Sequence, residues 1–267
     1  MGMDEKSNLL LRLFLFFEKI PDGSVDLILT DPPYGIRYQN HFTKKQKKPI
    51  AGDESLDFFT VGKGMLSHIE GKPTRLFFTR FDSYPLHYKY LEEAGFYIKN
   101  CLVVEKGTVG GIGDLKGSFA NNSEWIIFCQ KGRRIFQQTG LMKNRKPPGT
   151  VFHRGRKPSR EYKYRFNSCW FGEDYPKATY NAAWLSKHHI QHPTVKNVEC
   201  LSWLIQLSTL PQELVFDPFM GSGSTALAAE KTGRLYCGCE MEEEYCQLIK
   251  RRQQGVTENR EDTRTGI

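Results

Sequence analysis

Short apolar runs alternate with amphipathic stretches along most of the chain. The apolar runs predict buried strands at 25–30, 74–79, 97–104, 124–129, 214–216 and 235–240. Helical spacing of apolar residues predicts helices near 55–70, 85–94, 195–209, 225–231 and 242–253. Strands that alternate with helices predict an α/β fold, with a mostly parallel sheet and helices on both faces. The polar tail after Gln254 is expected to fray.

The periodic pattern is weak between residues 131 and 187, where the composition also changes. This segment holds 14 Lys or Arg against 3 acidic residues, a net charge of +11 in a chain whose total is +8. Aromatic residues such as Tyr162 and Trp170 are interleaved with the basic ones. The combination favours contact with nucleic acid phosphates and bases, with a solvated loop as the alternative. We therefore expect a catalytic domain, 1–130 with 188–267, and a basic insert, 131–187.

The composition indicates a globular protein and argues against a membrane-spanning or secreted one. A chain of 267 residues, 39% hydrophobic and 25% charged, is typical of a globular protein of one or two domains. The apolar run at 9–17 is too short to span a bilayer and is not followed by a signal-peptide cleavage site. The 7 cysteines are scattered and form no C-x-x-C pair. We expect a cytoplasmic protein without a metal site.

The first motif with chemical content is Asp31-Pro32-Pro33-Tyr34, directly after an apolar run. Ligands of α/β proteins collect at the carboxyl ends of strands, where this motif would lie. The prolines hold the turn rigid, and Asp31 and the Pro32 carbonyl offer two adjacent acceptors. Such a pair suits both hydrogens of an –NH2 group, and Tyr34 adds a flat face for a planar ring. An ordinary strand-terminal turn is the alternative reading.

The second motif is a glycine-rich turn after the apolar run 214–216. Gly221 and Gly223 let the backbone approach a ligand, and the helix that follows offers free N–H groups. Glu240 lies seventeen residues after Gly223, at the end of the next strand, where it can accept from ribose hydroxyls. The pattern predicts an adenosine-containing cofactor. A nicotinamide enzyme is the rival, but the turn comes late in the chain and the first motif has no role in hydride transfer. A P-loop is excluded because no Lys follows the glycines.

The two motifs, in this order and with a basic region between them, resemble the beta arrangement of the amino-group DNA methyltransferases. The segments Gly111–Gly117 and Glu124–Gly132 resemble the middle of phage and prophage members. His192-Pro193-Thr194 with Lys196 is similar to a family segment that helps to hold the methionyl end of the cofactor. The chain departs from the family at Leu11 and Arg12, where members usually have Gly-Asp.

The resemblance implies a Rossmann-like class I methyltransferase with a small target-recognition module at 131–187. It implies S-adenosylmethionine as cofactor and double-stranded DNA as substrate, with base flipping and direct methyl transfer. In the family, Asp before the prolines is more common in members that methylate adenine at N6, and Ser in members that methylate cytosine at N4. The resemblance therefore implies that Asp31 favours adenine. A bacterial or phage-encoded protein of restriction–modification is implied. The catalytic residues would be Asp31, Pro32, Pro33 and Tyr34.

Two further sets of residues follow from the motifs and the basic insert. The expected cofactor-binding residues are Asp31, His192, Thr194, Lys196, Asp217, Phe219, Gly221, Ser222, Gly223, Ser224, Thr225 and Glu240. The expected DNA-binding residues are Lys44, Lys45, Arg133, Arg134, Lys143, Arg145, Arg154, Arg156 and Lys157. Cytosine-N4 methylation and an RNA or protein-amide methyltransferase stay open, and a non-catalytic DNA-binding protein is disfavoured by the intact motifs. The sequence also leaves open the recognition site, a restriction partner and a homodimer.

Overall fold

The computed structural model describes the chain in several stretches. These are residues 19–34, 74–105, 117, 123–132, 150–151, 165–166, 169–170 and 195–264, with the side chains of 105, 150–151, 165–166, 169–170 and 255–264 outside the description. The predicted helix at 55–70 lies outside them. In the described part, no helix is long and apolar enough to cross a membrane.

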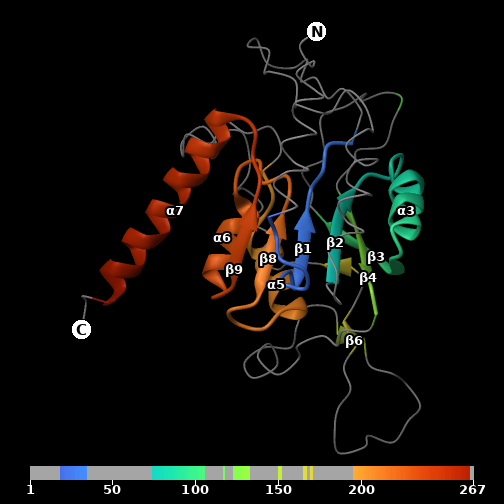
Figure 1. Cartoon of the computed structure of the whole chain (residues 1–267), viewed down its shortest axis with the longest axis horizontal. Coiled ribbons are helices and arrows are strands. Elements are labelled where there is room, and N and C mark those ends of the chain that lie inside the picture. The colour runs from blue at the N-terminus through green and yellow to red at the C-terminus, as the bar shows by residue number, and fades with distance from the viewer. Residues whose placement is uncertain are drawn as a thin grey trace, which may run out of the picture.

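A seven-stranded sheet forms the centre of the described part (Figure 1). The strands are β1 Leu27–Thr30, β2 Thr74–Thr79, β3 Tyr97–Glu105, β4 Ser123–Gln130, β7 Cys169–Trp170, β8 Leu214–Asp217 and β9 Leu235–Gly238. They lie in the order β7-β3-β4-β2-β1-β8-β9. Strand β4 is antiparallel to β2 and β3, whereas the other neighbours pair in parallel. The predicted mostly parallel α/β sheet is confirmed.

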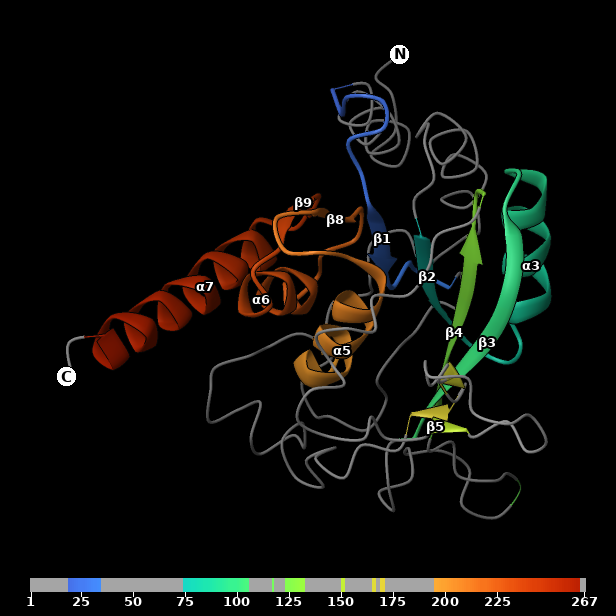
Figure 2. The ribbon, with the colours of Figure 1, turned by 90° about the horizontal axis from the view of Figure 1, so that it is seen from below.

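Helices cover both faces of this sheet, which explains why its central strands are mostly apolar, although β2 also buries Arg75. Side chains alternate along β1, so Leu27 and Leu29 join the core cluster that includes α5, Val198–Ser208, and α6, Ser224–Lys231. Ile28 points to the opposite cluster, which includes Leu91 of α3, Tyr84–Glu93. Figure 2 shows α3 on one side of the strands and α5 and α6 on the other.

The ends of two helices differ from the expectation. Helix α5 begins at Val198 and not near 195, because the Asn197 side chain caps it by accepting from the Cys200 N–H at 3.0 Å. The last helix, α7, runs over Glu243–Arg264 and extends away from the sheet (Figure 1). The expectation that the chain frays after Gln254 was wrong for residues 255–264, which are helical. Residues 255–264 are mostly polar and give no apolar period from which a helix could be predicted, and they continue the helix that begins at Glu243.

Short strands lie within the segment 131–187. Strand β7 extends the central sheet by pairing with β3 at Val103 and Val104. The strands β5, Thr150–Val151, and β6, Arg165–Phe166, form a separate antiparallel pair. Part of this segment therefore belongs to the catalytic sheet, and the role of the rest as a recognition module stays a prediction.

Candidate active site

The two sequence motifs meet where the order of strands in the sheet changes direction. From β1 the chain continues to β2 on one side, and from its neighbour β8 it continues to β9 on the other. The carboxyl ends of such strands form the crevice in which open α/β sheets bind ligands. Asp31 follows β1 here and Asp217 ends β8. The Thr30 hydroxyl links them by donating to Asp217 Oδ1 at 2.7 Å, across 187 positions of sequence.

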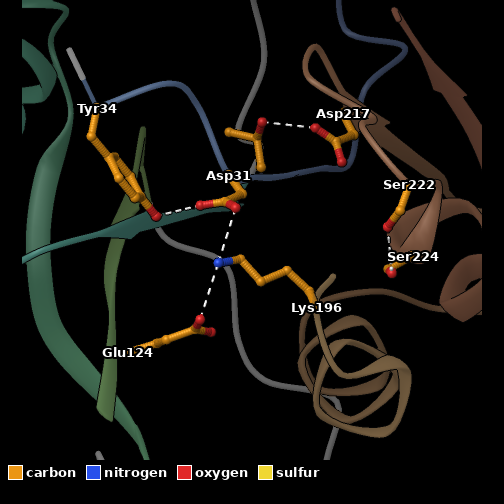
Figure 3. Close-up of polar contacts among 8 residues, drawn as sticks. Asp31, Tyr34, Glu124, Lys196, Asp217, Ser222 and Ser224 are labelled. Carbon is orange, nitrogen blue, oxygen red and sulfur yellow. Dashed lines mark hydrogen bonds and ion pairs between the residues drawn. The ribbon is translucent and has the colours of Figure 1, made fainter. Parts of the chain in front are cut away.

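A largely buried lysine, Lys196, pairs with the carboxylate of the first motif (Figure 3). Lys196 Nζ lies 2.9 Å from Asp31 Oδ2 and 3.2 Å from Glu124 Oε1, with side chains that are 11%, 20% and 21% exposed, respectively. We call Asp31, Glu124 and Lys196 the carboxylate–lysine cluster. Burial by itself lowers the pKa of Lys196, but the two carboxylates outweigh it and raise that pKa above its ordinary value. Lys196 is therefore an ammonium group that orients Asp31.

An aromatic side chain closes the cluster on the side of α3. The Tyr34 hydroxyl donates to Asp31 Oδ1, and the Tyr34 ring lies 6.0 Å from the His87 ring between centroids. Burial, together with the charge of Asp31, raises the pKa of Tyr34 well above its usual value, so the phenol stays protonated. Burial lowers the pKa of His87 to about 4, and its Nδ1 lies 2.8 Å from Thr79 Oγ1. Both rings are thus neutral at pH 7, and the Tyr34 ring lies between the buried His87 and Asp31.

The second motif forms a tight turn between β8 and α6. Gly221 and Gly223 have φ angles of +50° and +77°, which favour glycine. Glu240 Oε2 accepts from the Gly221 N–H at 2.7 Å, while Oε1 accepts from the N–H groups of Met241 and Glu242. Glu240 therefore joins the glycine turn to the end of β9.

The buried acid of the second motif holds the turn from within. Asp217 Oδ1 accepts from the Phe219 N–H at 3.0 Å. Burial raises the pKa of Asp217 to about 6, although hydrogen bonds from Thr225, Thr30 and Phe219 oppose this shift. The neighbouring strand comes so close that a Cβ on Gly238 would lie 2.3 Å from the Asp217 carbonyl oxygen. Only glycine fits at that position.

This arrangement fits an adenosine-containing cofactor. The turn has two glycines in the left-handed region and leads into the N-terminus of α6, whose free N–H groups and dipole favour acceptor groups of a ligand. The acid after the neighbouring strand, Glu240, accepts from three backbone N–H groups in this structure, so its contact with a ribose stays a prediction. Among the described residues, no group of three His, Cys, Asp or Glu could hold a metal ion.

The structure brings together five of the residues singled out in the sequence. Asp31, Tyr34, Lys196, Asp217 and Glu240 lie around the crevice. Lys196 was expected to help hold the cofactor. Its ammonium group contacts Asp31 and Glu124, so its cofactor contact stays a prediction.

Other predicted residues are placed by the fold or lie outside the described stretches. Ser222 and Ser224 are buried, with their Oγ atoms 3.2 Å apart. His192, Thr194 and all nine predicted DNA-binding residues lie outside the described residues. The sequence did not single out Glu124 or Thr30 as site residues. The signals for Glu124 were an acid at the start of an apolar run and the family resemblance of Glu124–Gly132, and Thr30 was read as the end of a strand.

Comparison with known proteins agrees with this geometry. The profile of the N6_N4_Mtase family, described as DNA methylase, matches residues 25–251. The chain belongs to this family of amino DNA methyltransferases. The Type II methyltransferase M1.MboII of Moraxella bovis is 26% identical over 255 residues, which cover 88% of this chain and 91% of the relative. The Type II methyltransferase M2.LlaDCHI of Lactococcus lactis subsp. cremoris is 27% identical over 268 residues, covering 93% and 90%.

Solved structures confirm the class I methyltransferase fold. The M1.HpyAVI–SAM complex has a TM-score of 0.55 at 20% identity, covering 93% of this chain and 96% of that one. The PvuII DNA methyltransferase, described as cytosine-N4-specific, has a TM-score of 0.58 at 18% identity, covering 88% and 81%. Family membership makes the protein a DNA methyltransferase with S-adenosylmethionine as methyl donor.

Proposed function

We propose that this DNA methyltransferase methylates adenine at N6 in double-stranded DNA, with Asp31 receiving the target amine. The observation that carries the proposal is the position of Asp31, at the crevice between the two motifs and with Lys196 on its Oδ2 atom. The acceptor pair suits the amine of either adenine or cytosine. Asp at this position, where cytosine-N4 members more often have Ser, supports adenine.

The residues of the first motif can activate the target amine as a nucleophile. An exocyclic amine is a poor nucleophile because its lone pair is delocalised into the ring. Accepting its two N–H groups at Asp31 and at the Pro32 carbonyl favours a tetrahedral nitrogen whose lone pair is free to attack. S-adenosylmethionine, when bound, supplies an electrophilic methyl group on a sulfonium leaving group. The protein contributes position and electrostatics, and no covalent enzyme intermediate is required.

Asp31 can accept hydrogen bonds from the amine while it stays paired with Lys196. Each carboxylate oxygen can accept two hydrogen bonds, so Lys196 can stay on Oδ2 while the amine binds. The Tyr34 hydroxyl donates to Oδ1 in the free protein and gives way when the base arrives. The Tyr34 ring then stacks on the flipped base and recovers part of the cost of unstacking it from the duplex.

We assign the cofactor to the glycine turn and Glu240. The predicted set there comprises Asp217, Phe219, Gly221, Ser222, Gly223, Ser224, Thr225 and Glu240. Their support is the left-handed turn at the start of α6 and the acid beside it. His192, Thr194 and Lys196 would face the methionyl end, as the resemblance implies.

DNA is assigned to the basic residues of the insert and to Lys44 and Lys45. The support is the net charge of +11 within 131–187, which matches the phosphate backbone of DNA. Relatives named Type II methyltransferases, and M.BamHII of Bacillus amyloliquefaciens, named an orphan methyltransferase, support a role in DNA modification, with or without a restriction enzyme.

Replacing Asp31 tests the proposed function. Asp31→Ala should lower tritiated-methyl incorporation into DNA by roughly a hundredfold or more, since one preorganised polar contact of this kind is worth that much. Cofactor affinity measured by calorimetry should stay close to that of the unaltered protein. More than about a tenth of the original rate would refute the role of Asp31.

The target base is decided by mass spectrometry of nucleosides from methylated duplex DNA. We expect N6-methyladenine. A product that contains only N4-methylcytosine would overturn the choice of base and leave the role of Asp31 standing.

A further inference from the structure

We infer that His87 is a positioning residue of methyl transfer, which holds the Tyr34 ring in the orientation that stacks on the flipped base. The inference rests on the proposed function, because that function gives the Tyr34 ring its role in stacking. It concerns the step at which the target amine binds Asp31. The Tyr34 hydroxyl then gives up its acceptor on Asp31, and the orientation of the ring depends on its remaining contacts.

The His87 ring is held at the corner where β2 leads into α3. Strand β2 ends at Thr79, and α3 begins at Tyr84. His87 Nδ1 lies 2.8 Å from Thr79 Oγ1, and the His87 N–H donates to the Ser83 carbonyl oxygen at 3.1 Å. His87 and Thr79 are 0% and 3% exposed. A side chain that is buried and tied to both a strand and a helix keeps one orientation, so it can fix the orientation of a neighbour.

The residue type at this position favours a role beyond packing. Burying an imidazole costs free energy relative to an apolar side chain unless its polar atoms are hydrogen-bonded. Leu91, one turn further along α3, is also buried and packs in the core with an apolar side chain. His87 is the buried residue of α3 whose ring lies next to Tyr34. Burial lowers the pKa of His87 to about 4, so the contact joins two neutral rings.

The two contacts of Tyr34 involve different parts of its side chain. The centroids of the Tyr34 and His87 rings are 6.0 Å apart and the ring planes are tilted by 36°, a geometry within the usual range of aromatic pairs. The Tyr34 hydroxyl, in contrast, donates to Asp31 Oδ1 (Figure 3). The target amine therefore displaces the hydroxyl contact and leaves the ring contact in place. His87 supports the ring while the base binds.

The plane of the Tyr34 ring affects where the flipped base lies. Stacked rings are nearly parallel, so a Tyr34 ring that turns takes the base with it. The amine of that base must reach Asp31 and the Pro32 carbonyl, and its lone pair must point at the methyl group. Such placement is sensitive, since an error of about 1 Å can lower a rate about a hundredfold. A contact that fixes the ring plane therefore acts on methyl transfer to DNA and not on the affinity for the cofactor.

The test is a double-mutant cycle on the full-length protein. Tritiated-methyl incorporation into unmethylated duplex DNA gives kcat and KM for the unaltered protein, His87→Leu, Tyr34→Leu and the double variant. We expect His87→Leu to lower kcat/KM for DNA about fivefold, the usual contribution of one aromatic pair, and to leave Kd for S-adenosylmethionine unchanged. In the Tyr34→Leu protein, His87→Leu should have little further effect, because the ring on which it acts is gone. Independent, multiplicative losses would overturn the inference.

Variants of the same helix distinguish the ring contact from general packing. His87→Phe keeps an aromatic ring and should retain about half or more of kcat/KM, and Thr79 Oγ1 still has the Arg80 carbonyl oxygen as an acceptor at 3.3 Å. A loss equal to that of His87→Leu would overturn the inference. The matched control is Tyr88→Leu. It removes another aromatic pair of α3, between Tyr84 and Tyr88 at 5.9 Å, and should leave kcat/KM unchanged.

The cycle also separates this inference from the proposed function. If Tyr34→Leu keeps the unaltered kcat/KM, the stacking role of Tyr34 fails and the inference fails with it. If Tyr34→Leu is slower and His87→Leu is not, the inference alone fails. Should thermal unfolding show that His87→Leu folds poorly, His87→Gln takes its place, because it keeps a polar partner for Thr79 and lacks the ring. It should show the same fivefold loss, and an unchanged kcat/KM would overturn the inference.

Discussion

At the scale of single residues, Asp217 shows how the site holds an unfavourable charge. The residue is 3% exposed, and burial raises its pKa to about 6. Hydrogen bonds from Thr30 and from the Phe219 N–H offset part of the cost. The protein keeps this acid where two motifs must be joined, which is typical of functional sites.

Asp217→Asn should make the protein more stable at neutral pH. The folded pKa lies above the unfolded value of 3.8, so the folded state keeps a proton that the unfolded state has lost between about pH 4 and 6. The contribution of Asp217 to stability therefore falls as pH rises through that window. At pH 8 the variant should gain up to about 3 kcal/mol in free energy of unfolding, and below pH 4 it should gain little.

Urea denaturation of both proteins from pH 4 to 8 checks this difference. Asp22→Asn, at an exposed position before β1, is the control and should leave the pH dependence unchanged. A variant less stable than the unaltered protein at every pH would show that the hydrogen bonds of the carboxylate outweigh its burial.

At the scale of elements, α7 supports the glycine turn. A Cβ on Gly223 would lie 2.8 Å from Ile249 Cγ1 of α7. Arg252, one turn further along α7, donates to the Ser222 carbonyl oxygen. The close approach at Gly223 in this structure is thus to a helix, whereas the sequence suggested a ligand. Helix α7 shapes the cofactor turn from behind.

Gly223→Ala should destabilise the protein by about 2 kcal/mol. Part of the loss is the left-handed φ of +77° and part is the contact with Ile249. In an Ile249→Ala background the contact disappears, so the added cost of Gly223→Ala should fall to about 1 kcal/mol. A double-mutant cycle of thermal or urea unfolding measures this coupling. Strict additivity of the two substitutions would show that Ile249 does not constrain the turn.

At the scale of the whole molecule, the excess basic charge and the catalytic motifs lie in different segments of the chain. The segment 131–187 has a net charge of +11, whereas the whole chain has +8. The rest of the chain is therefore slightly acidic, with a net charge of −3. Among the described residues, the acids Asp31, Glu124, Asp217 and Glu240 and the one cation Lys196 lie at the crevice. A protein with this distribution is expected to hold DNA by the basic segment and to receive only a single base at the crevice.

Replacing Arg154, Arg156 and Lys157 together by Gln should weaken duplex binding and its dependence on salt. Each lost phosphate contact lowers the slope of log K against log salt by about 0.9, so three contacts correspond to about 2.7. Fluorescence anisotropy from about 50 to 200 mM salt measures the slope. Lys89→Gln, on the exposed surface of α3, is the control. An unchanged slope would show that these three residues do not contact phosphate.

The sequence by itself determined the elements and the two motifs. Strand β2 has the predicted bounds, and the other predicted strands are found within two residues of theirs. Strands buried on both faces are mostly apolar, and a turn that needs Asp, Pro or Gly shows those residues locally. The length of α7 was underestimated because the sequence of 255–264 has no apolar period.

Only the tertiary structure decided how these pieces form a site. The carboxylate–lysine cluster is formed by three separate segments, which contribute Asp31, Glu124 and Lys196. The local sequence around each of these residues does not predict its contact with the other two. Glu124 reaches Lys196 because β4 runs antiparallel to β2; in a parallel strand it would lie at the opposite edge of the sheet. Strand direction and order depend on how the whole core packs, so the chain's local pattern could identify Asp31 but not the charges that surround it.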